Sequence, residues 1–249
     1  MRIRTEADRE NLREGGRRLA EILRKTAERA RVGVTLKELD TYARGLAKAY
    51  GDTPSFEGYG KPPFPGMLCL SVNHGIVHGI PNEYVLEEGD LLKIDGGIWH
   101  NGLCTDSAIT IPIGTIIKEE EMLIRATREA IEAQIAAAIA GNTVGDIGYA
   151  AEQVAKKYDL GYPKELGGHG VGLAVHEQPF IANFGKPGSG VVLKVDDVLA
   201  LEPMFAVGSG RICLANDGWL YEMVDGSQSA HFEHTVIVGE TEAEVVTKE

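Results

Sequence analysis

Two aspartates that could hold a metal ion, Asp95 and Asp106, lie in the stretch 91–113, LLKIDGGIWHNGLCTDSAITIPI. Apolar-rich runs flank Asn101-Gly102, and this dipeptide suits the left-handed backbone of a two-residue turn, so the stretch predicts a β-hairpin. With that turn, Asp106 pairs with Gly97, Asp95 lies diagonally beside it, and both carboxylates point to one face. Two inward carboxylates repel unless a cation lies between them, which favours a metal site over two solvated aspartates on an exposed sheet face.

Further candidate ligands come from the second half of the chain. They are His169 in GGHGVG, His176 in VHEQP, Glu202 in VLALEPMF and Glu233 in SAHFEHTVIV. Glu202 is costly to bury unpaired within its apolar run, which favours burial with a cation. His169 has the alternative of a polar loop residue, and Glu233 that of an outward edge-strand residue, because the neighbours 231, 232 and 234 blur the alternation. Four carboxylates and one or two imidazoles suit two divalent ions such as Mn, Fe, Co or Zn.

Several other chemistries are not supported. The stretch HEQPF lacks the second histidine of a zincin HExxH motif, and Pro179 would break the helix that this motif needs. There is no GxSxG, and GGHGVG matches neither the GxGxxG nor the phosphate-binding GKS/T pattern. Cys104 lies two residues from a candidate metal-binding aspartate, and a small buried side chain explains it more simply than a nucleophile does.

The elements that would position these residues follow from periodicity and capping signals. Helices are predicted at about 5–31, 35–50, 118–140 and 143–158, with Thr-x-x-Asp/Glu capping boxes at the start of the first two. Residues 67–72, MLCLSV, predict a short buried strand. The preceding SFEGYGKPPFP segment predicts a surface loop that carries aromatic residues.

The chain also contains a weak internal duplication. Apolar positions of the helix at 35–50 recur at 143–158 with a constant offset of 108 residues. VHGIP recurs as VHEQP and LEEGDLLKID as LKVDDVLALE, which places Glu202 at the position equivalent to Asp95. The alternative is chance similarity between amphipathic helices. Three echoes in one order instead predict an α+β fold of two pseudo-symmetric halves, about 5–115 and 116–240, within a single catalytic domain at 1–249. The seam between the halves is then the expected place of the site.

Composition limits the classes of function. A formal charge of -12 over 249 residues argues against general binding to nucleic acid or to an anionic membrane. Seven basic residues between positions 13 and 31 crowd the first predicted helix, either as an ordinary solvated face or as a docking surface. The three cysteines show no disulfide or zinc-knuckle spacing, and there is no signal peptide and no membrane-length apolar run. These features predict a soluble cytoplasmic protein.

Together the sequence blocks resemble those of methionine aminopeptidase, the bacterial type without an N-terminal zinc-binding extension. The resemblance runs along nearly the whole chain, through SVNHGIVHGIP, KIDGGIWHNGLCTDSA, GGHGVGLAVHEQP, LALEPMF and SAHFEHT in order. It implies the "pita-bread" fold, a pseudo-symmetric antiparallel sheet curved over the site with helices on its outer face. Aminopeptidase P and prolidase are similar in fold and ligands, but they usually carry an extra N-terminal domain, and the VHGIP block favours the methionine enzyme.

The resemblance also implies residue roles. Five residues match the family's ligands for two divalent ions, Asp95, Asp106, His169, Glu202 and Glu233, with Asp106 and Glu233 bridging. His78 and His176 match two active-site histidines that are not ligands, and Glu202 matches a proton shuttle. The methionine side chain would be enclosed by Tyr59, Phe64, Cys69 and Trp219, whose alternative role is that of ordinary core residues. The implied reaction removes the initiator methionine from nascent peptides with a small second residue, through a metal-bridging hydroxide. The implied protein is a monomer whose basic first helix could touch the ribosome.

The sequence departs from the family pattern in three places. Val175 stands where many relatives have Phe, the loop around Lys61-Pro62-Pro63 is lengthened, and His74 is unusual. A reshaped pocket would change which side chains are accepted. A different class of function is a metal-free binding module that keeps the fold and loses the ligands. All five ligand positions are occupied by metal-binding residue types, which argues against this class.

Overall fold

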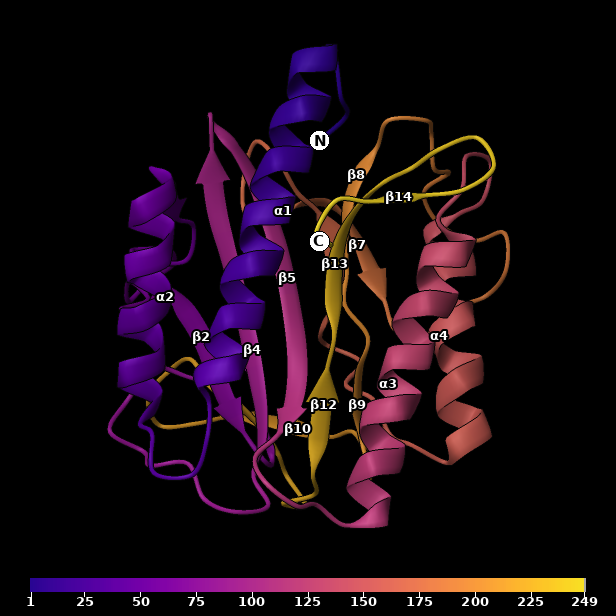
Figure 1. Cartoon of the computed structure of the whole chain (residues 1–249). Helices are drawn as coiled ribbons and strands as arrows, with labels where there is room; N and C mark the ends of the chain where they lie inside the picture. Colours follow the sequence, from indigo (N-terminus) through magenta and orange to yellow (C-terminus); the bar gives the residue numbers. More distant parts are fainter. Residues whose placement is uncertain (249) are drawn as a thin grey trace.

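The computed structural model describes residues 1–248 and has mixed α+β architecture (Figure 1). In the described part of the chain the helices are α1 (Glu6–Arg29), α2 (Leu36–Tyr50), α3 (Lys118–Ala137) and α4 (Val144–Tyr158). The strands are β1 (Thr53–Pro54), β2 (Leu68–Val72), β3 (Gly75–Val77), β4 (Leu91–His100), β5 (Leu103–Pro112), β6 (Gly167–Gly170), β7 (Glu177–Ala182), β8 (Val198–Leu201), β9 (Met204–Ala206), β10 (Ile212–Leu214), β11 (Tyr221–Met223), β12 (Ser229–His231), β13 (Glu233–Ile237) and β14 (Glu244–Val245).

One large antiparallel sheet organises these elements. Its strand order is β1-β4-β5-β13-β8-β6-β7, with β2 paired to β4 and β14 to β13. Two smaller sheets, β10-β11-β3 and β12-β9, extend it. The helices pack on one face of the large sheet, where α1 crosses β4 and β5 (Figure 1). The helices bury one face of the large sheet, and the opposite face of the sheet is available for a site. The predicted fold class is confirmed.

The β4–β5 hairpin forms with the predicted turn and register. Asn101 and Gly102 have φ of 48° and 81°, the left-handed values that a two-residue hairpin turn requires. Asp106 pairs with Gly97, as predicted. A side chain at Gly96 would meet Leu19 and Leu23 of α1, so the alternating positions 95 and 97 face away from the helices. The alternative of solvated aspartates is wrong, because Asp95 and Asp106 are only 7% and 3% exposed.

Capping residues explain where the helices begin. Thr5 with Asp8, Thr35 with Glu38 and Thr143 with Asp146 each form a reciprocal capping box. α2 and α4 have equal lengths of 15 residues and lie 108 residues apart, as the duplication predicts.

The prediction for α3 was wrong at its end, because the helix stops at Ala137 rather than at residue 140. The backbone beyond it pairs with Gly239 instead of continuing the helix.

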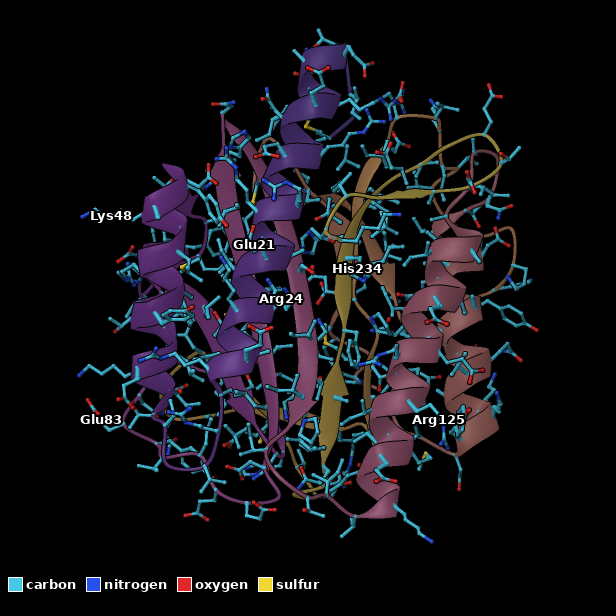
Figure 2. All side chains as sticks on the ribbon, viewed as in Figure 1. Glu21, Arg24, Lys48, Glu83, Arg125 and His234 are labelled. Carbon is cyan, nitrogen blue, oxygen red and sulfur yellow. The ribbon has the colours of Figure 1, made fainter. Side chains whose placement is uncertain are left out.

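Two other predictions are refined by the structure. The segment 55–65 is a loop, but Phe56 and Phe64 turn inward and are 9% and 2% exposed, so calling it a surface loop was only partly right. The basic side chains of α1 form ion pairs within the chain, for example Arg17 with Glu14 and Lys25 with Glu21. Figure 2 shows Glu21 on this outer helix. Such pairs are typical of a solvated helix face, and ribosome docking stays a prediction.

All three cysteines are free, with Cys69 and Cys104 buried and Cys213 exposed, in line with their unpaired spacing. In the part of the chain that the structure describes, none of the helices has the length and apolarity needed to cross a membrane.

A glycine inside α1 yields a stability prediction. A Cβ at Gly16 would overlap the backbone carbonyl of Val246, whereas a Cβ at Gly45 of α2 would meet nothing within 4 Å. We expect Gly16→Ala to lower the free energy of unfolding by about 1 to 3 kcal/mol, because overpacking outweighs the better helix propensity of alanine. Gly45→Ala should raise it by up to about 1 kcal/mol. Urea unfolding of both variants measures the contrast, and equal effects would contradict the packing argument.

Candidate metal centre

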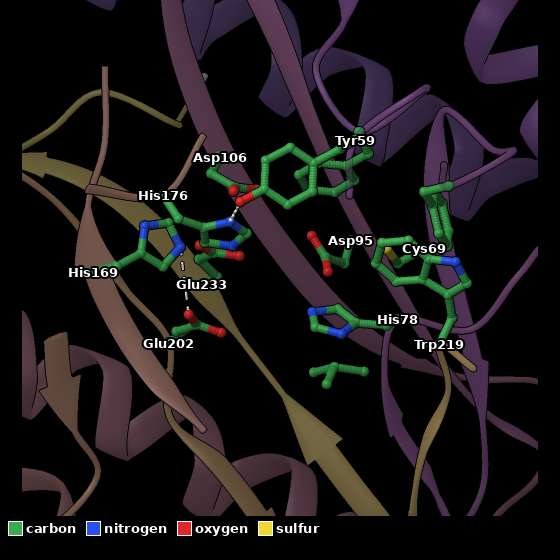
Figure 3. Close-up of a pocket in the computed structure, with 13 residues that line it drawn as sticks. Tyr59, Cys69, His78, Asp95, Asp106, His169, His176, Glu202, Trp219 and Glu233 are labelled. Atoms are coloured by element: carbon green, nitrogen blue, oxygen red, sulfur yellow. Dashed lines mark hydrogen bonds and ion pairs between the residues drawn. The ribbon is translucent and has the colours of Figure 1, made fainter. Parts of the chain in front are cut away.

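The five predicted ligands come from five strands that are consecutive in the large sheet. The strand order β4-β5-β13-β8-β6 carries, one per strand or strand end, Asp95, Asp106, Glu233, Glu202 and His169. Register aligns them, because Asp95 and Glu233 both pair with Ala108 from opposite sides and His169 pairs with Ala200. Figure 3 shows their side chains converging on one cavity. The sheet therefore brings together residues that are up to 138 positions apart in the chain.

The four carboxylates of the site are buried close together, which is electrostatically unfavourable. Asp95, Asp106, Glu202 and Glu233 are each at most 9% exposed. Burial raises the pKa of all four well above the usual carboxyl range, and the nearby carboxylates raise these pKa values further. One oxygen each of Asp95, Asp106 and Glu233 is buried and has no hydrogen-bond partner within residues 1–248. Buried, unpartnered, mutually repelling carboxylates fit divalent cations, which would supply the missing positive charge.

His169 is oriented to offer a nitrogen to such a cation. Its Nδ1 lies 2.9 Å from the carbonyl oxygen of Gly170, which can only accept, so Nδ1 carries the proton. The free Nε2 lies 3.5 Å from Glu202 Oε1. Burial lowers the pKa of His169 to about 4, which keeps the imidazole neutral. Donor atoms of Asp106, His169 and Glu233 lie within 4.8 Å of one another, a spacing compatible with a shared ion.

The two other predicted histidines lie on the rim of the cavity. The ring of His176 is 4.4 Å from that of His169, and its Nδ1 is 2.7 Å from the hydroxyl of Tyr59 (Figure 3). His78 has a φ of 61°, which is rare for a residue other than glycine and points to a position held by its surroundings. Burial lowers the pKa of His78 to about 4, and that of His176 is lowered for the same reason. Neutral imidazoles can both donate and accept a hydrogen bond here.

An apolar pocket adjoins the carboxylates. The cavity contains about 530 Å³ of empty space, part of which is open to solvent, and its walls include all four predicted pocket residues, Tyr59, Phe64, Cys69 and Trp219. Phe64 and Trp219 meet edge to face with ring centroids 5.1 Å apart. Phe56 and Val77 also line it, and the sequence interpretation missed both. One side of the cavity is thus apolar and aromatic, and the other is made of carboxylates and imidazoles.

Comparison with known proteins decides the family. The model of "Metallopeptidase family M24" matches residues 10–240. The chain belongs to metallopeptidase family M24. This M24 chain is 39% identical over 246 residues to the methionine aminopeptidase of Clostridium perfringens, covering 98% of each. It superposes on the crystal structure of methionine aminopeptidase from Thermotoga maritima with a TM-score of 0.97 and 36% identity, covering 100% of both chains. These matches confirm the predicted resemblance to methionine aminopeptidases. They also confirm the prediction that the protein is a hydrolytic enzyme.

A more distant solved structure shows likeness in fold alone. The prolidase of Pyrococcus furiosus matches with a TM-score of 0.79 at 23% identity, and the match covers 99% of this chain but 65% of the prolidase. The likeness supports the curved-sheet architecture predicted above.

One residue of this M24 site was missed by the sequence interpretation. His231 is 1% exposed, and its Nε2 lies 3.4 Å from Glu202 Oε2 and 3.9 Å from Glu233 Oε2. Burial lowers the pKa of His231 to about 3. The available signal was the spacing of two residues to Glu233, which places both side chains on one face of an extended chain. The sequence interpretation treated His231 only as a residue that blurs the alternation of its strand.

The raised carboxyl pKa values predict how metal-free protein responds to pH. A raised folded-state pKa contributes stability that is full below the ordinary carboxyl pKa of 3.8 to 4.5 and is lost as pH rises through the raised value. We expect metal-free protein to lose stability with rising pH above this range, by at most about 1.4 kcal/mol per pH unit for each titrating carboxyl. Urea unfolding at several pH values with and without MnCl₂ tests this. A metal-free protein whose stability is constant or rises across this window would contradict the electrostatic argument.

Proposed function

We propose that this enzyme removes N-terminal methionine from peptides whose second residue is small, with two divalent cations held by Asp95, Asp106, His169, Glu202 and Glu233. One observation carries the proposal. The apolar pocket and the carboxylate–imidazole cluster line the same cavity, so a side chain in the pocket would place the adjacent amide at the cluster. The methionine aminopeptidases similar to this chain support the same assignment. Both halves contribute ligands, so residues 1–249 would act as one catalytic domain.

The chemistry follows from the cluster. Divalent cations bound there would acidify water and polarise the scissile carbonyl. Glu202 would take a proton from the attacking water and pass it to the leaving amine. With the Tyr59 hydroxyl donating to its Nδ1, His176 would carry its proton on Nε2 and donate a hydrogen bond from there to the developing oxyanion. His78, across the cavity, would bind the backbone of the peptide.

The pocket explains why a methionine side chain would be preferred. Edge-to-face packing between Phe64 and Trp219 gives an apolar slot without charges. Cys69 lies deep in the wall, where burial and the charge of Asp95 raise the pKa of its thiol, so it stays neutral and small. A long, unbranched and polarisable thioether fits such a slot.

Removal of one carboxylate charge tests the metal-dependent reaction. We expect Asp106→Asn to lower kcat/KM for Met-Ala-Ser by at least about 1,000-fold, because the variant removes a negative charge from the middle of the cluster. Chelation of the wild-type enzyme should abolish activity, and Mn²⁺, Co²⁺ or Fe²⁺ should restore it. Asp159→Asn, an exposed carboxylate at the end of α4, serves as the control and should retain full activity. Hydrolysis at the same rate with and without chelator would refute the metal-dependent reaction and would favour a mechanism that needs no metal.

A glycine contact tests the pocket. A Cβ at Gly60 would overlap the indole of Trp219, whereas one at Gly58 would meet nothing within 4 Å, and both glycines have left-handed φ near 80°. We expect Gly60→Ala to raise KM for Met-Ala-Ser about tenfold, because the indole must move, with a smaller effect on kcat. Gly58→Ala carries the same backbone strain without the contact and should change KM by less than about twofold. Equal effects of the two variants would show that Trp219 does not form the pocket wall.

A further inference from the structure

His231 lies at the metal centre with both ring nitrogens unused. Neither Nδ1 nor Nε2 has a hydrogen-bond partner among the described residues, although the side chain is 1% exposed. Its backbone, in contrast, is fixed on both sides by Thr110 of β5. The Thr110 hydroxyl accepts from the N–H of His231 at 2.9 Å and donates to its carbonyl oxygen at 2.6 Å. A held but unpartnered buried imidazole is a polar group that needs a ligand.

The positions of the neighbouring carboxylates point to a cation rather than to a hydrogen bond. Nε2 lies 3.4 Å from Glu202 Oε2 and 3.9 Å from Glu233 Oε2, and neither contact is a hydrogen bond. Two donor atoms that each lie about 2.1 Å from one ion are separated by about 3.0 to 3.4 Å at octahedral or tetrahedral angles, a range that the distance to Glu202 meets and the distance to Glu233 exceeds. Donor atoms of Glu202, His231 and Glu233 lie within 4.8 Å of one another, like those of Asp106, His169 and Glu233.

We propose that His231 Nε2 is a metal ligand, together with Glu202 and Glu233. The centre then consists of two overlapping groups of donors that share Glu233, with His169 supplying the imidazole of one group and His231 that of the other. This inference deepens the proposed function and rests on the cations proposed there. It adds a ligand that lies outside the set expected from the family resemblance.

A second imidazole changes which ions the centre should prefer. Oxygen-only sites suit Mg²⁺ and Mn²⁺, whereas an added neutral nitrogen favours Fe²⁺, Co²⁺ and Zn²⁺. With one imidazole in each donor group, neither of the two ion positions would be held by oxygen alone. We therefore expect Zn²⁺ to bind with two equivalents of similar affinity.

The experiment counts imidazoles directly. Wild-type protein is loaded with two equivalents of Zn²⁺, the number of imidazoles per zinc is measured by X-ray absorption, and Zn²⁺ affinity is measured by calorimetry. The variants are His231→Gln and the control His234→Gln. His234 lies on the opposite, helix-side face of β13, where its Nδ1 is 3.0 Å from Thr247 Oγ1 (Figure 2).

The expected result is one imidazole per zinc in the wild type, on average, and half that number in His231→Gln. The dissociation constant of one of the two equivalents should rise at least tenfold in His231→Gln and stay unchanged in His234→Gln. A wild type with one imidazole for two zinc ions would overturn the role of His231 while leaving the proposed function intact, and this reading does not depend on whether the variant folds. A wild type that binds no Zn²⁺, Mn²⁺, Co²⁺ or Fe²⁺ would overturn both.

Discussion

Repulsion among buried carboxylates is the constraint on which this structure depends. Asp95, Asp106, Glu202 and Glu233 lie together beneath the surface, and the pKa of each is raised by burial and by the others. Such a group is costly in the absence of cations, because the interior screens the charges poorly. The protein can hold these carboxylates together only if the surrounding backbone is too rigid to let them move apart. Five consecutive strands of one antiparallel sheet, backed by helices on the other face, supply such a backbone.

The duplicated plan explains how one chain assembles this group. α2 and α4 are equal in length and equivalent in position, and Glu202 stands in the second half where Asp95 stands in the first. Each half contributes two of the four carboxylates, so they meet at the seam between the halves, where β5 pairs with β13. The buried Lys93 ties that seam together, because its Nζ donates to the carbonyl oxygens of Asn73 and Ser229, one from each half.

Local sequence signals predict the strands and helices that support the site. They do not predict every residue of the site. Asn101-Gly102 determines the register of β4 against β5, since only one turn type suits it, and the register then determines the facing of Asp95 and Asp106. The end of α3 depends instead on pairing with Gly239, a hundred residues away, which no local pattern reveals. His231 was missed because its strand has mixed alternation. Its importance becomes visible only when β12, which pairs with β9, brings it beside Glu202 and Glu233.

Local sequence patterns reveal less about the pocket than about any other part of the site. The construction of the pocket would link substrate selectivity to catalysis. Tyr59 and Phe64 belong to the loop between β1 and β2, whereas Trp219 comes from another loop 155 residues beyond Phe64. The same loop that lines the pocket places the hydroxyl of Tyr59 on Nδ1 of His176. A side chain that displaces this loop would therefore lose its own contacts with the pocket and would also break the hydrogen bond between Tyr59 and His176. One segment thus forms the pocket wall and holds the ring of His176, so under the function proposed above binding energy in the pocket would contribute to the rate.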